Sequence, residues 1–144
     1  MHDKDGGVDD KADRKPGGWN PSNYYQDLQL LLKAFDHDRA AGHKPRIELV
    51  EGNIVDTVPE YVANNPGLKI KLLHIDCDMY DPTLAGLRHL YDRVVRGGVI
   101  LLDEYGLPEF PGETAAVDEF FQGKMPVIRK FPFYTTPGGY IIKE

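Results

Sequence analysis

The stretch LLHIDCDMYDPTLAGLRHLYDRVVRGGVILLDEYG, residues 72–106, decides the fold class of this chain. Its first part belongs to a nearly continuous apolar run over 70–75, which is typical of a strand covered on both faces in a parallel sheet. Pro82 then begins a segment with apolar residues at helical spacing, which Gly97 and Gly98 close. A second apolar strand follows over 99–102. This order of strand, helix and strand predicts an α/β fold with a mostly parallel sheet.

The flanking segments continue the pattern. Periodicity predicts a helix from Ser22 to near Gly42, a strand over 46–50, and helices over 56–64 and 113–121. The last elements are predicted to be a C-terminal antiparallel strand pair, 127–133 with 140–143. Residues 1–21 are polar and charged, with almost no apolar side chains, so we expect a mobile polar leader there. The folded part is then 22–144.

Length and composition exclude several classes of protein. The chain has 144 residues, enough for one domain with a core but not for two. Its 23 acidic and 17 basic residues leave a net charge of -6, which argues against nucleic acid or an anionic membrane as a partner. No apolar run approaches the roughly 18 residues of a membrane span, and the first ten residues do not resemble a signal peptide. We therefore expect a cytoplasmic protein. The single cysteine, Cys77, excludes an internal disulfide.

Two acidic clusters follow the two apolar strands. Asp76 and Asp78 leave the first strand, and Asp103 and Glu104 end the second. Ligands in open α/β sheets bind at the carboxyl ends of the strands. If the strands are neighbours, Asp76, Asp103 and Glu104 converge there and repel one another unless a cation lies between them. Carboxylate oxygens suit Mg²⁺, Mn²⁺ or Ca²⁺, so the pattern predicts a divalent metal site.

Each polar residue near these strands also has a structural interpretation. Strand-end acids can face solvent or cap a helix, and Asp78 is placed to cap the helix that begins near Pro82. His74 lies inside the apolar strand and is expected to be a core histidine. Cys77, between two aspartates, is expected to have a raised pKa and a packing role. Asn53 follows Gly52 and could either approach a ligand or form a turn.

The stretch 72–106 resembles the macrocin O-methyltransferase family, metal-dependent sugar O-methyltransferases that use S-adenosylmethionine. Members share a D-x-D-x-Y-x-x-T run, present here over 76–83, followed by a Gly-Gly strand that ends in a paired acid. IELVEGNIVDTVPEYV, residues 47–62, and FPGETAAVDEFF, residues 110–121, also look like this family. The resemblance covers 46–144 and implies a partial Rossmann-like class I methyltransferase fold.

The resemblance also implies a role for individual residues. Asp76, Asp103 and Glu104 match the metal ligands, and Asp78 matches the general base. Asn53, Ile54 and Cys77 match positions beside the cofactor. The implied cofactors are S-adenosylmethionine and Mg²⁺ or another divalent cation, and the implied partner is a sugar or glycoside. A metal-bound sugar hydroxyl would lose its proton to Asp78 and attack the methyl sulfonium. Many relatives carry a second aspartate where this chain has Glu104.

One part of the family pattern is not found before Arg46. Class I methyltransferases hold the cofactor with a glycine-rich loop after their first strand and an acid after the second, and Gly6-Gly7 and Gly17-Gly18 follow no strand. With the family's strand order 3-2-1-4-5-7-6, the strand over 46–50 is the third and lacks its neighbours. Residues 22–144 are then the C-terminal part of such a domain, lacking its first two strands. The unpaired strand should fray or pair between chains in a homo-oligomer.

Two alternatives remain open. DCDMY, residues 76–80, also matches the D-x-D motif of haloacid-dehalogenase-type phosphatases, although that motif belongs on the first strand. The other alternative is a truncated, non-catalytic remnant of the methyltransferase fold that binds a partner.

Overall fold

The computed structural model describes residues 2–6, 24–44 and 46–144. The chain divides into two compact units, one formed by 1–7 with 52–144 and the other by 8–51. Each unit is described by itself. Every helix among the described residues falls short of the length and apolar character that a membrane span requires.

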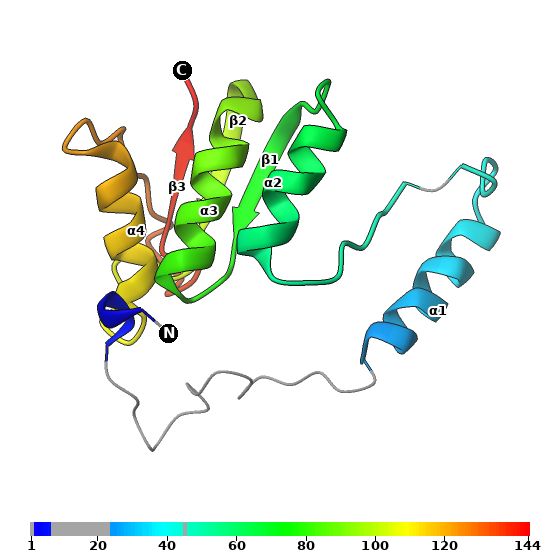
Figure 1. Ribbon diagram of the computed structural model, residues 1–144, viewed down its shortest axis with the longest axis horizontal. Helices are drawn as coiled ribbons and strands as arrows, with labels where there is room; N and C mark the ends of the chain where they lie inside the picture. Colours follow the sequence, from blue (N-terminus) through cyan, green and yellow to red (C-terminus); the bar gives the residue numbers. More distant parts are fainter. Residues whose placement is uncertain (1, 7–23, 45) are drawn as a thin grey trace. The chain divides into compact units, whose positions relative to one another are not determined.

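The larger unit is a three-stranded sheet with helices on one face (Figure 1). The strands lie in the order β1-β2-β3, with β1 parallel to β2 and β3 antiparallel to β2. This confirms the α/β class and the mostly parallel sheet. The elements in chain order are η1 (Asp3–Asp5), α2 (Ile54–Asn64), β1 (Ile70–Ile75), α3 (Tyr80–Leu90), η2 (Tyr91–Arg93), β2 (Val94–Leu102), α4 (Pro111–Phe121) and β3 (Gly139–Ile142).

The core lies between the sheet and its helices. Leu73 and Ile75 of β1 are 8% and 3% exposed and pack with Leu87 of α3, which is fully buried. Leu72, which alternates with them along the same strand, is 59% exposed. The prediction that β1 is covered on both faces is therefore wrong for the described residues. The apolar run over β1 supplies a buried face and, at Leu72, an open one.

The boundaries of β2 and of the last strand differ from the prediction. β2 begins at Val94, so Gly97 and Gly98 lie inside the strand and do not close a helix. They coincide with a register irregularity against β1, and Gly97 has φ 70°, a backbone conformation that glycine adopts without strain. The predicted pairing of 127–133 with 140–143 is reduced to a single bridge between Arg129 and Tyr140. The antiparallel pair is instead β2 with β3, joined from Val99 to Leu102.

The smaller unit contains α1 (Tyr24–His37). The helix ends at His37, five residues before the predicted end near Gly42, and Arg39 forms an ion pair with Asp36 in the last turn of α1. The predicted helix start, Ser22, lies outside the described residues. Residues 46–50 form no strand in the part of the chain that the structure describes, so that prediction is wrong. Strand formation needs a hydrogen-bonded neighbour, and local sequence alone does not provide one.

Residues 2–6, which the sequence analysis placed in the leader, pack against α3 and α4. The Asp5 carboxylate accepts a hydrogen bond from the Tyr80 N–H at the start of α3 (2.6 Å). Lys4 Nζ lies 2.5 Å from Glu119 Oε2 on α4, and the Tyr80 hydroxyl donates to the same oxygen. A mobile leader would not make such contacts, so residues 2–6 differ from the prediction. Residues 7–21 of the predicted leader lie outside the described residues.

Candidate functional site

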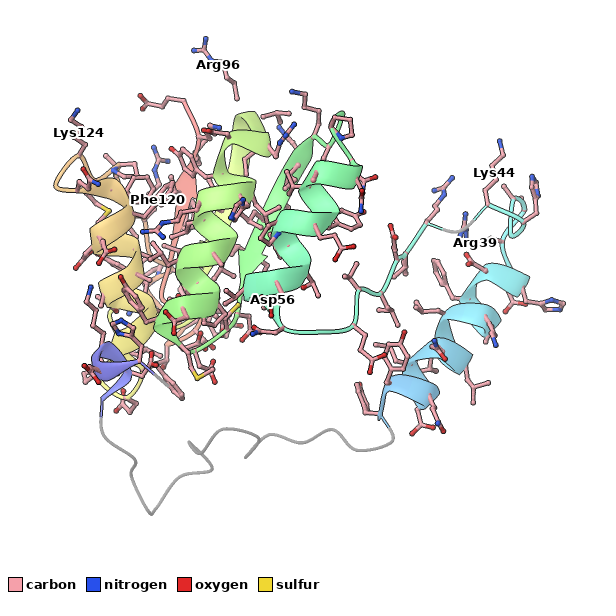
Figure 2. All side chains as sticks on the ribbon, in the orientation of Figure 1. Arg39, Lys44, Asp56, Arg96, Phe120 and Lys124 are labelled. Carbon is pink, nitrogen blue, oxygen red and sulfur yellow. The ribbon has the colours of Figure 1, made fainter. Side chains whose placement is uncertain are left out.

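The site begins where β1 and β2 end. Ile75 pairs with Leu102 in the parallel register, so Asp76 and Asp103 leave neighbouring strands at the same level. The Asp103 N–H donates to the Ile75 carbonyl (3.0 Å), which continues the ladder one step further. Figure 2 places Asp56 at this edge of the unit, and Arg96 and Lys124 at the opposite edge. The acidic edge predicted from the sequence therefore forms.

Side chains at this edge form two overlapping groups. Asp76, Asp78 and Glu104 each offer a carboxylate oxygen, and these oxygens lie within 4.8 Å of one another. His74, Asp76 and Asp103 form a second group by the same measure. Asp76 belongs to both groups. The three predicted ligands therefore lie at one edge but are divided between the two groups: Glu104 is grouped with Asp78 and Asp103 with His74, and neither group contains both Asp103 and Glu104.

Asp78 has a strained backbone and does not cap a helix. Its φ is 60°, in the left-handed region that few residues other than glycine adopt. α3 has Met79 as its N-cap without a side-chain cap, and Asp5 accepts the Tyr80 N–H. The interpretation of Asp78 as the cap is therefore wrong. Burial raises the pKa of Asp78, and the charges of Asp76 and Asp103 raise it further.

Glu104 is a buried carboxyl in contact with a second one. Glu104 is 6% exposed, and Glu113 of α4 is fully buried. Glu113 Oε1 accepts a hydrogen bond from the Glu104 N–H (3.0 Å). Burial is the main cause that raises the pKa of Glu104 to about 9 and that of Glu113 to about 7. Glu113 was not among the predicted site residues, because its position in a helix gave no sign that it faces the strand ends.

The backbone after β2 is held on several sides. The Asp103 carbonyl accepts from the Gly138 N–H (2.6 Å), and the Gly106 N–H donates to Thr114 Oγ1 (2.9 Å). Gly138 approaches Tyr105 so closely that a Cβ atom would overlap the Tyr105 backbone. With the bond from Glu104 to Glu113, the loop that carries Asp103 and Glu104 is anchored to α4 and to the segment before β3.

His74 is placed differently from the prediction. Its side chain is 44% exposed and lies on the open face of β1, so it is not a core histidine. His74 Nε2 lies 2.9 Å from Asp103 Oδ1. This hydrogen bond orients the Asp103 carboxylate. The alternation of side chains along a strand puts His74 on the face opposite to Leu73 and Ile75. Which of the two faces is covered depends on where the helices pack.

The three predicted cofactor residues lie in different settings. Asn53 is the N-cap of α2, and its Oδ1 accepts from the Val55 N–H (3.2 Å). Ile54 is the first residue of that helix and is half-buried. Cys77 is half-buried against the core, and burial raises the pKa of its thiol to about 11, as expected for a packing residue and not for a nucleophile.

The donor set at the acidic edge fits a hard divalent cation. Carboxylate oxygens from Asp76, Asp78, Asp103 and Glu104 are the ligands that Mg²⁺ and Mn²⁺ prefer. Glu104 Oε2 is buried without a hydrogen-bond partner among the described residues. Buried oxygens of this kind normally have a partner. A cation would provide one and would offset the repulsion between neighbouring carboxylates.

Comparison with known proteins identifies the family. Residues 33–126 match the family model described as macrocin-O-methyltransferase (TylF). The chain belongs to this family. Two solved structures are similar to it, the apo structure of CalS11, a TDP-rhamnose 3'-O-methyltransferase of calicheamicin biosynthesis, and a crystal structure of CalS11 described as a calicheamicin methyltransferase.

The similarity to the CalS11 structures extends over most of the chain. The first matches with a TM-score of 0.78 and 31% identity over 86% of this chain and 54% of that one. The second matches with a TM-score of 0.79 and 31% identity over 94% and 55%. This chain therefore spans about half the length of these structures. No match was found among curated proteins. The family also argues against the phosphatase alternative.

The buried carboxyls Glu104 and Glu113 predict how the free energy of unfolding of this macrocin-O-methyltransferase family member changes with pH. Burial is the main cause that raises the pKa of both Glu104 and Glu113 above the ordinary value of 4.5, so the folded pair keeps protons at pH values at which the unfolded chain has lost them. The folded chain therefore binds more protons than the unfolded chain above that value, and its stability falls as the pH rises. Urea unfolding in EDTA at about pH 5 and about pH 8.5 should show this fall. Glu104→Gln should reduce it. Equal stability at both pH values would contradict the prediction.

Proposed function

We propose that this chain is the catalytic C-terminal part of an S-adenosylmethionine-dependent O-methyltransferase that acts on a sugar hydroxyl with a divalent cation. The observation that supports this most directly is the convergence of Asp76, Asp78 and Glu104 within 4.8 Å at the end of a parallel strand pair. Family membership supplies the reaction class. The proposal assigns these carboxylates to the metal and to the proton that the acceptor hydroxyl must lose.

The residues have separate roles in this proposal. Asp76, Asp103 and Glu104 would hold the cation, which when bound lowers the pKa of a sugar hydroxyl. Asp78 accepts the proton of that hydroxyl. Its raised pKa makes it a better base than an ordinary aspartate. His74 keeps Asp103 oriented through the bond to Nε2.

The cofactor and the acceptor follow from the family. Asn53, Ile54 and Cys77 are proposed to lie beside S-adenosylmethionine. CalS11 is described as a TDP-rhamnose 3'-O-methyltransferase, and we propose a sugar or glycoside as the acceptor here as well. The hydroxyl that is methylated is left open by this proposal. A homo-oligomer in which the segment 46–50 pairs between two chains is also proposed, since this segment forms no strand among the described residues.

The proposed function predicts a difference between the isolated chain and a longer form. We expect this chain to bind S-adenosylhomocysteine only weakly, because the glycine-rich loop and the ribose-binding acid of the family were not found in it. A form extended upstream should transfer methyl from S-adenosylmethionine to a sugar, and EDTA should stop the transfer. Calorimetric titration and a methyl-transfer assay measure the two effects. Micromolar binding of S-adenosylhomocysteine by the isolated chain would contradict the expected weak binding. Methyl transfer that survives EDTA would contradict the role of the cation.

A further inference from the structure

Glu113 is a buried acid that the proposed mechanism does not use. It is fully buried in the first turn of α4, beside Ala116 and Val117, which are also fully buried. Burying a carboxylate is costly unless specific partners compensate for it. Glu113 Oε2 has no hydrogen-bond partner among the described residues. An apolar side chain would pack there at lower cost, so the acid requires a reason.

The hydrogen bond of Glu113 points to that reason. Glu113 is the third residue of α4, a position from which glutamate often accepts the N–H of its own helix cap. Here its Oε1 accepts the N–H of Glu104, nine residues earlier and directly beyond β2. This bond determines how the chain leaves β2. The side chain of Glu104 then lies against Asp76 and Asp78.

Glu104 has a particular need for such support. Glutamate has one more rotatable bond than aspartate, so its carboxylate has more positions open to it. Glu104 reaches its place among Asp76 and Asp78 while 6% exposed, with its backbone N–H bound by Glu113. Partners in the outer shell of a metal site orient the ligands in this way.

We propose that Glu113 is a positioning residue of the metal site, which directs the Glu104 carboxylate toward the cation through the Glu104 N–H. The proposal rests on the metal site of the proposed function. It assigns no contact with the cation to Glu113 itself. Its effect on the cation passes through Glu104 alone.

The test is Mn²⁺ titration of the full chain and its variants, followed by calorimetry. Glu113→Met removes the acceptor at nearly constant volume, and we expect Mn²⁺ affinity to fall about 10- to 100-fold. Glu113→Gln keeps an acceptor oxygen, so its affinity should stay close to that of the parent. Thr114→Val is the matched control, because it removes the neighbouring bond to Gly106 and keeps the bond between Glu113 and the Glu104 N–H. In a Glu104→Ala background, Glu113→Met should cause no further loss.

Several results would overturn the proposal. These are unchanged affinity in Glu113→Met, an equal loss in Glu113→Gln or Thr114→Val, or a further loss in the Glu104→Ala background. Should Glu113→Met fail to fold, hydrogen exchange decides: the Glu104 amide should exchange slowly in the parent and in Glu113→Gln, and fast exchange would overturn the proposal. If the parent does not bind Mn²⁺, the proposed metal site fails and this proposal with it. If the parent binds and Asp76→Asn does not, the site stands and only the role of Glu113 is in question.

Discussion

Asp76→Asn should abolish Mn²⁺ binding and leave the metal-free chain at least as stable as the parent. Asp76 is the residue common to both groups at the acidic edge, so its loss removes an oxygen from each. We expect affinity to fall by more than about 100-fold, beyond the loss that an outer-shell partner causes. The metal-free fold should gain stability because the variant removes the repulsion between Asp76 and Asp78, which is one cause of the raised pKa of Asp78.

Mn²⁺ titration together with thermal melts, with and without the ion, measures both effects. Mn²⁺ at about 100 times its dissociation constant stabilises the parent by about 2.7 kcal/mol, and this gain should vanish in the variant. Asp81→Asn is the control, because Asp81 is exposed on α3 and belongs to neither group. Equal affinity in the parent and in Asp76→Asn would refute the site.

Asp78→Asn belongs to the same experiment. If Asp78 is the base, the variant should bind Mn²⁺ and the complete enzyme should lose methyl transfer. If Asp78 is a ligand, Mn²⁺ binding falls with it. The short separation of Asp76, Asp78 and Glu104 permits either role, so the titration decides between them.

Leu73→Ala should destabilise the larger unit by about 2–5 kcal/mol, the usual cost of truncating a buried leucine. Leu73 packs against Leu87 and Ile100 in the core and is 8% exposed. Leu72→Ala is the matched control, since it changes the same residue type at the preceding position of β1. Leu72 is 59% exposed, and we expect a loss of less than about 1 kcal/mol.

Urea unfolding followed by circular dichroism measures this pair of variants. A large difference between them would support an open face on β1 in solution. Equal losses would mean that another chain or segment covers Leu72, and light scattering at several concentrations would show whether that is a second copy.

Much of the fold could be predicted because it depends on local patterns. The bounds of β1 agree with the apolar run over 70–75, and α4 agrees with the predicted helix to within two residues at its start. Two apolar strands joined by a helix require a parallel pair. Asp76 and Asp103 follow directly after those strands, so the order of the elements was enough to predict that they lie close together.

The errors occurred where the outcome depends on distant parts of the chain. Residues 46–50 have the composition of a strand but form no strand among the described residues. Asp78 was expected to cap α3, whereas Asp5, 75 residues before Tyr80, accepts that N–H. Such bonds join segments that no short window of sequence contains.

The sequence by itself determined the order of strands and helices, the family motif and the acids at the strand ends, because periodicity and spacing are local properties. Only the tertiary structure decided which face of β1 is covered, which placed Leu72 and His74 on the open side. It also decided that α4 directs Glu113 onto the Glu104 N–H. The physical reason is that burial and long-range hydrogen bonds depend on how the elements pack. The packing of α4 against the end of β2 provides the Glu113 carboxylate with a hydrogen-bond donor that its own helix does not supply.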